Sequence, residues 1–277
     1  MISVVELGTV DYATGLRLQE RLVALRKENR VGDVLLLLEH TPVITLGRNA
    51  KRENVIASTE KLAAREVELF ECDRGGDVTF HGPGQMVGYP IFDLRAEISQ
   101  AGSKKTLGAV DYVRRLEEVL IRTCADFGIP AQRIAGLTGV WTTPDNAASE
   151  VRVRPVDQSA TDVSERKIAA IGVHISRAVT SHGFALNVNT DLRYFDLIVP
   201  CGITSKPVTS MAVQLGRKLS LQDVAHSISR NFGVVFQSQM LWLEDLESLL
   251  KTTIGVPMTV PSELREIHKD DEDTAWA

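Results

Sequence analysis

Hydrophobic and polar positions in the first third of the chain follow two periods, one typical of helices and one of buried strands. Tyr12–Glu28 carries leucine and valine at helical spacing, which predicts an amphipathic helix. Val34–Glu39 begins as a continuous apolar run, the pattern of a strand buried on both faces. The same criteria predict further strands at Val4–Leu7, Pro42–Gly47 and Val67–Cys72, with a short helix near Thr59–Arg65.

The rest of the chain continues to mix strands and helices. Leu107–Phe127 is the clearest helix, and Cys124 lies on its apolar stripe, where we expect a core thiol. A hairpin is predicted over Val78–Leu94, turning at Gly82-Pro83-Gly84. Further strands are predicted at Lys167–Ile175 and Ser181–Asn189, and helices at Ser220–Gly233 and Leu241–Lys251. This order of elements favours an α+β fold.

The chain shows no linker that would divide it, so we expect a single catalytic domain over residues 1–253. Residues 144–166 are polar and without periodicity, which predicts a loop insertion. Residues 254–277 form a charged, polar tail.

Composition narrows the class of protein. The net charge of −5 over 277 residues lacks the basic excess of a nucleic-acid-binding protein. The three cysteines are far apart, which predicts no disulfide framework and fits a reducing compartment. There is no signal-peptide pattern at the N-terminus and no apolar run long enough to span a membrane. We therefore expect a cytoplasmic enzyme that binds neither nucleic acid nor membrane and acts as a monomer.

Two segments combine glycines with chemically capable side chains. In Arg74–Gln85, glycines permit close backbone approach to a ligand, and Thr79 and His81 share one face of a strand. This glycine run lacks the spacing of a phosphate-binding loop. Taken alone, His81 is typical of a satisfied strand histidine, and His174 and His182 lack the additional ligands that a metal site requires.

The second segment contains Cys201, in the sequence Val-Pro-Cys-Gly-Ile, with Lys167 upstream. A thiol is a strong nucleophile as its thiolate, and a neutral lysine amine can remove its proton. The pair suits acyl transfer through a thioester, although either residue can also be an ordinary structural side chain.

Several motifs together resemble the lipoyl(octanoyl) transferases. The clearest is Arg74–Tyr89, with the sequence Arg-Gly-Gly-Asp-Val-Thr-Phe-His-Gly-Pro-Gly-Gln-Met-Val-Gly-Tyr. The other matching motifs are Gly139–Trp141, Lys167–Val173, Ser181–Asn189 and Val199–Ile203, in the order of that family. The resemblance extends from about Val4 to Phe232.

This resemblance implies a function. Such enzymes transfer an octanoyl group from octanoyl-acyl carrier protein to a lysine of a lipoyl domain of 2-oxoacid dehydrogenase complexes, or of the glycine cleavage H protein. It implies Cys201 as nucleophile, Lys167 as acid/base, and the mixed sheet flanked by helices of lipoate and biotin protein ligases. No cofactor is implied, because a thioester donor is already activated. We expect substrate-binding residues at Arg74, Gly75, Gly76, Thr79, His81, Gly82, Tyr89, Gly172, Val173, His174, Gly183 and Ala185.

Two alternatives remain open at this point. An ATP-dependent ligase of the same fold would activate a free acid and would not need Cys201. A non-catalytic module would bind acyl carrier or lipoyl domains without turnover. For either protein substrate, both of which are generally acidic in this family, Arg48, Lys51 and Arg52 are a candidate docking patch.

Overall fold

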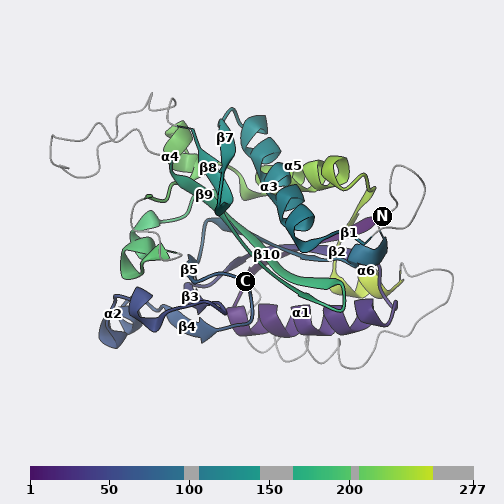
Figure 1. Ribbon diagram of the computed structural model, residues 1–277, viewed down its shortest axis with the longest axis horizontal. Helices are drawn as coiled ribbons and strands as arrows, with labels where there is room; N and C mark the ends of the chain where they lie inside the picture. The colour runs from purple at the N-terminus through teal and green to yellow at the C-terminus, as the bar shows by residue number, and fades with distance from the viewer. Residues whose placement is uncertain (97–105, 144–164, 201–205, 252–277) are drawn as a thin grey trace.

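The computed structural model describes residues 1–96, 106–143, 165–200 and 206–251. Its centre is a sheet of eight strands in the order β11-β1-β2-β6-β10-β9-β8-β7 (Figure 1). Parallel pairs (β1 with β2 and with β11) occur beside antiparallel ones, so the sheet is mixed, as expected. The strands are β1 (Ile2–Val10), β2 (Asp33–His40), β6 (Gln85–Ile91), β7 (Ala131–Ile134), β8 (Leu137–Thr142), β9 (Lys167–Ser176), β10 (Val179–Asn187) and β11 (Met240–Leu243).

Helices cover both faces of this sheet. α1 (Tyr12–Lys27) lies against β6 and β10 on one face, and α3 (Ala109–Asp126) and α5 (Leu221–Val235) pack together on the other (Figure 1). The apolar side chains of β2 alternate between the two faces of the sheet. Leu35 and Leu37 join the core under α3 and α5, whereas Val34, Leu36 and Leu38 join the core under α1. This burial on both faces is why β2 is continuously apolar.

A second sheet of three strands, in the order β4-β3-β5, lies beside the start of α1 (Figure 1). Its strands are β3 (Val43–Leu46), β4 (Glu68–Glu71) and β5 (Val78–His81). It has its own apolar cluster, to which α2 (Thr59–Ala63) and the 3₁₀ helix η4 (Leu192–Leu197) contribute. The remaining short elements of the described residues are α4 (Met211–Leu215), α6 (Leu246–Lys251), η1 (Arg52–Asn54) and η2 (Leu94–Ala96).

Most predicted helices are confirmed, with local causes for their ends. Asp11 caps α1 by accepting a hydrogen bond from the Thr14 amide at 2.8 Å, and Ser220 caps α5 through Asp223. α5 continues through Gly233 to Val235, two residues beyond the predicted end. Cys124 is fully buried in α3, and burial raises the pKa of its thiol to about 12, as befits a core residue.

Two predictions about strands are wrong. Val78–Leu94 is not a hairpin, because β5 pairs with β3 in the small sheet while β6 pairs with β2 and β10 in the large one. Gly84, at φ +80°, makes the turn that passes the chain from one sheet to the other. Leu241–Lys251 is not one helix either: its first part forms β11 against β1, and α6 follows.

Candidate active site

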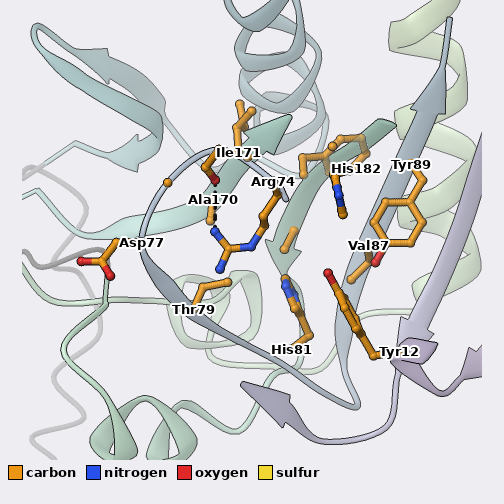
Figure 2. Close-up of a pocket in the computed structure, with 16 residues that line it drawn as sticks. Tyr12, Arg74, Asp77, Thr79, His81, Val87, Tyr89, Ala170, Ile171 and His182 are labelled. Carbon is orange, nitrogen blue, oxygen red and sulfur yellow. Dashed lines mark hydrogen bonds between the residues drawn. The ribbon is translucent and has the colours of Figure 1, made fainter. Parts of the chain in front are cut away.

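A cavity lies between the large sheet, the small sheet and the start of α1. It encloses about 480 Å³ of empty space, counted with its open mouth. Figure 2 shows side chains from β5, β6, β9 and β10 converging on it, with Tyr12 entering from α1. Its lining consists of Tyr12, Arg74, Gly75, Gly76, Asp77, Thr79, His81, Val87, Tyr89, Ala170, Ile171, Gly172, His182, Gly183, Phe184 and Ala185.

Small residues on two neighbouring strands form one side of this cavity. Ala170 pairs with Ala185, and Gly172 with Gly183, across the antiparallel β9–β10 ladder. Alternation of side chains along a strand places these four positions on one face of the sheet. Because none of them carries more than a methyl group, they leave a trough along the strands, which we call the β9–β10 trough.

The Arg74–Gly76 loop covers part of the trough. The Gly75 amide donates to the Val173 carbonyl at 3.0 Å, and a Cβ on Gly172 would come within 2.6 Å of the Gly75 carbonyl oxygen. Arg74 is buried, and its guanidinium donates to the Thr45 carbonyl at 2.6 Å and to the Thr45 hydroxyl at 2.9 Å. The arginine therefore holds the loop against β3.

His81 belongs to a buried hydrogen-bond chain. Gln85 uses its amide nitrogen to donate to the Phe80 carbonyl and, at 2.9 Å, to Asn187, so its oxygen faces His81. His81 must then donate from Nδ1, at 2.7 Å, which leaves Nε2 as an acceptor. Burial lowers the pKa of His81 to about 3, so it is neutral near neutral pH. Asn187 continues the chain by donating to the Thr209 carbonyl at 3.0 Å.

A second neutral histidine lies beside the first. His40 Nδ1 donates to the Val10 carbonyl at 2.7 Å, and its Nε2 accepts from the Tyr89 hydroxyl at 2.6 Å. Burial lowers the pKa of His40 to about 4. Tyr12 lies between these groups and is 1% exposed, and its hydroxyl has no nitrogen or oxygen partner among the described residues. Burial raises the pKa of the Tyr12 hydroxyl, which therefore stays protonated.

His182 occupies a strained position within β10. Its φ of +54° is unusual for a side-chain-bearing residue in mid-strand. Two contacts hold it there: its amide donates to the Gln19 side chain at 2.6 Å, and its Nε2 contacts Asp73 at 2.7 Å. Burial lowers the pKa of His182, although Asp73 opposes that shift. Such strain persists where the surroundings over-determine a conformation, commonly at functional sites.

Lys167 opens β9, three residues before Ala170 of the trough, and is not among the residues that line the cavity. Its amide donates to the Pro207 carbonyl, and its carbonyl accepts from the Thr209 amide, both at 2.9 Å. The lysine side chain is buried, and its Nζ lies 5.2 Å from the centre of the Trp141 ring. Cys201 lies outside the described residues, as do the expected loop insertion except for residues 165 and 166, and the tail.

The structure thus brings together nine of the twelve positions expected to bind substrate. Gly82, Val173 and His174 do not line the cavity: Gly82 packs on Phe80, Val173 contributes its carbonyl to Gly75, and His174 lies against Asp73. The lining residues that the sequence did not single out for binding are Tyr12, Asp77, Val87, Ala170, Ile171, His182 and Phe184. Of these, Tyr12 lies outside every motif that resembles the transferase family, whereas the other six lie within such motifs.

The expected basic patch has acidic neighbours. Arg48, Lys51 and Arg52 are exposed, and each lies within 4.0 Å of a carboxylate, those of Asp73, Glu53 and Glu71 respectively. Its role in docking stays a prediction. Within the described residues, no cluster of histidine, cysteine and carboxylate groups has a metal-binding arrangement, and no helix is long and apolar enough to cross a membrane.

Comparison with known proteins agrees with the sequence resemblance. Residues 11–233 match the family model of the lipoyl protein ligase A/B catalytic domain. An octanoyltransferase of Koribacter versatilis is 58% identical over 98% of each chain, and one of Acidobacterium capsulatum is 56% identical over 90% of this chain and 96% of its own.

Solved structures with the same fold include lipoate ligases. A bipartite lipoate protein ligase of Thermoplasma acidophilum superposes with a TM-score of 0.65 at 15% identity, covering 98% of this chain and 92% of its own. A lipoate-protein ligase A bound with ATP superposes with a TM-score of 0.64 at 14% identity, covering 99% of this chain and 95% of its own. At such identities the likeness concerns the fold, and it confirms the expected α+β class with a mixed sheet flanked by helices.

Proposed function

The chain belongs to the lipoyl protein ligase A/B catalytic family and is an octanoyltransferase, and from this premise we propose its donor, acceptor and mechanism. The donor is octanoyl-acyl carrier protein. The acceptor is a lysine of a lipoyl domain of 2-oxoacid dehydrogenase complexes or of the glycine cleavage H protein. The acyl group passes through a thioester on Cys201, with Lys167 moving the protons.

The observation that carries the proposal is the β9–β10 trough, together with the lysine at the start of β9. Val87 pairs with Ala185 across β6 and β10 and adds an apolar side chain to the lining, so the trough suits an acyl chain. The strand that forms it begins at Lys167, and the backbone partner of that lysine is Pro207, six residues after Cys201. An acyl chain in the trough would have its carbonyl end toward these two residues.

The proposed reaction balances with these two groups. The neutral Lys167 amine takes the Cys201 proton, and the thiolate attacks the donor carbonyl. The carrier thiolate departs and takes that proton from the Lys167 ammonium. The neutral amine of the acceptor lysine then attacks the Cys201 thioester, and Lys167 transfers the amine proton to the departing Cys201 thiolate. The Trp141 ring would stabilise the ammonium form of Lys167 between these steps.

Intact mass spectrometry of the chain mixed with octanoyl-acyl carrier protein, without acceptor, tests the mechanism. We expect an octanoyl adduct on the wild type that a lipoyl domain discharges, and none on Cys201→Ser. Lys167→Ala should form the adduct at least about 100-fold more slowly, the usual loss on removing an acid/base group. Cys72→Ser, which changes a half-buried thiol beside Tyr12 but keeps Cys201, is the matched control and should still form the adduct.

Other outcomes would change the proposal. Transfer without an adduct would mean direct attack by the acceptor lysine, and Cys201 would lose its role. Normal adduct formation by Lys167→Ala would remove that lysine from the mechanism. Octanoylation that requires ATP and free octanoate would identify a ligase, and binding without turnover in every assay would identify a non-catalytic module.

A further inference from the structure

The aliphatic part of Lys167 lies against the backbone of a glycine on the neighbouring strand. Gly139, in β8, has φ +121°, a conformation that side-chain-bearing residues rarely adopt. A Cβ at this position would come within 2.8 Å of Lys167 Cε and 3.5 Å of its Nζ. It would also approach the Ala169 carbonyl oxygen to 2.7 Å. The missing side chain of Gly139 is therefore the space that the lysine chain occupies.

Trp141 contributes a second contact to the same lysine. The β8–β9 ladder shifts register between Val140, which pairs with Ala169, and Trp141, which pairs with Lys167. This irregularity brings the Trp141 ring to 5.2 Å from Lys167 Nζ. The Lys167 side chain thus has the Gly139 backbone as one neighbour and the Trp141 indole as another, and the path of β8 determines where its amine lies.

A buried carboxylate holds β8 on this path. Glu117, on α3, is fully buried, and its Oε1 accepts a hydrogen bond from the Gly139 amide at 3.2 Å. Its other oxygen accepts from Arg114 at 2.7 Å and from Arg133 at 3.1 Å. The Glu117 carboxylate thus joins two guanidinium groups and one backbone amide in a single buried hydrogen-bond network.

We propose that Glu117 is a positioning residue for Lys167 and acts through Gly139. Its carboxylate fixes the Gly139 amide, which fixes the glycine surface on which the lysine chain rests. Without that hydrogen bond, β8 can move relative to β9, and the amine moves with it. A displacement of about 1 Å at a reacting group can cost on the order of 100-fold in rate. The inference rests on the proposed acid/base role of Lys167.

Glu117→Gln tests the proposal with little change in shape. The amide cannot satisfy both Gly139 and the two arginines, so we expect kcat for octanoyl transfer to fall about 10- to 100-fold. KM for octanoyl-acyl carrier protein should stay within twofold, because Glu117 does not line the trough. Gly139→Ala should lower kcat at least as much, since its Cβ would enter the space of Lys167 Cε.

Two other carboxylates on α3 provide controls. Glu118→Gln removes a carboxylate that also pairs with Arg133 but has no contact with Gly139. Asp126→Asn breaks a network with Ser227 and Asn231 at the far end of the helix, and so reports the cost of lost stability alone. All variants are assayed well below their measured unfolding midpoints. We expect both controls to keep the wild-type kcat.

The outcomes separate this inference from the mechanism it builds on. If Lys167→Ala is inactive while Glu117→Gln and Gly139→Ala keep the wild-type kcat, the positioning role is overturned and the mechanism stands. If Lys167→Ala keeps full activity, the proposed mechanism fails and this inference with it. If Asp126→Asn, equally destabilised, loses as much kcat as Glu117→Gln, the effect is general destabilisation and Glu117 has no positioning role.

Discussion

At the scale of single residues, the trough ends at side chains that the sequence did not single out for binding. His182 pairs with Val173, six positions along β9 from Lys167, and its buried ring faces the cavity beside Tyr89 (Figure 2). An acyl chain with its carbonyl near Lys167 would run along the trough toward His182, whose side chain lines the far end of the cavity.

Replacing His182 by alanine should lengthen the accepted acyl chain. Each additional buried methylene contributes about 0.8 kcal/mol, or roughly fourfold, so two of them favour decanoyl over octanoyl by about 15-fold relative to wild type. Competition between decanoyl- and octanoyl-acyl carrier protein measures the ratio of their kcat/KM values. His174→Ala is the control, because His174 also contacts Asp73 but lies outside the lining. An unchanged ratio in His182→Ala would show that another residue sets the limit.

The sequence identified cavity residues that stand in an unusual local pattern. It missed those that reach the cavity only through the tertiary arrangement. Gly75, Gly76 and Thr79 stood out because a glycine run beside polar residues is unusual, and they line the cavity. Tyr12 read as the first residue of an amphipathic helix, which it is. That it also faces the cavity depends on how α1 meets the small sheet, a tertiary contact without a local signal.

At the scale of elements, one loop joins the two sheets over the trough. Arg74 attaches this loop to β3 through Thr45, and Gly75 attaches it to β9 through Val173. The arginine was expected to bind substrate, a role that stays a prediction. The guanidinium also holds the loop in place, since four of its hydrogen bonds go to Thr45 and Gly75.

Arg74→Lys should therefore loosen the loop. An ammonium keeps the charge but cannot reproduce the planar fork that reaches both the carbonyl and the hydroxyl of Thr45. Loss of such charged hydrogen bonds should lower the free energy of unfolding by roughly 1.5–3 kcal/mol and raise KM for the donor. Urea unfolding and initial rates measure these effects, with the exposed Arg52→Lys as control. Wild-type stability in Arg74→Lys would contradict the attachment role.

The same elements explain why the predicted hairpin failed. Gly82-Pro83-Gly84 is a strong turn signal, and β5 and β6 both exist. Turn chemistry specifies that the chain reverses or bends, but not which strand each arm will pair with. That choice depended on β3 and β2, two strands distant in sequence, so local pattern could not settle it. β11 was assigned to a helix for a related reason: its partner β1 lies at the other end of the chain.

At the scale of the whole molecule, two neutral histidines are buried where the sheets and α1 meet. His40 and His81 have ring centres 6.0 Å apart, and Tyr12 and Tyr89 lie beside them. Desolvation lowers the pKa of His40 to about 4 and that of His81 to about 3, against 6.5 for an unperturbed side chain. Between these pKa values and 6.5, the two histidines are therefore neutral in the folded protein but protonated in the unfolded chain.

The consequence is a loss of stability in acid. Above pH 6.5 both histidines are neutral in the folded and in the unfolded protein, so they do not reduce the free energy of unfolding. As the pH falls from 6.5 toward 4, the unfolded state binds a proton at each histidine and the folded state does not. Stability then decreases by up to about 1.4 kcal/mol per pH unit for each histidine. The carboxylates with lowered pKa values, Asp73 among them, add to the loss at lower pH.

His40→Gln isolates one of these protons. Urea unfolding at pH 7, 6, 5 and 4 gives the slope of stability against pH, which should be smaller in the variant by up to about 1.4 kcal/mol per pH unit between pH 6 and 5. The slope is the diagnostic quantity, because glutamine also changes the stability at pH 7 by altering the contacts with Val10 and Tyr89. His226→Gln, on the exposed face of α5, is the control for exchanging a histidine for glutamine outside this buried cluster. A wild-type slope in His40→Gln would mean that His40 is already charged in the folded protein, and Tyr89 could then no longer donate its proton to Nε2.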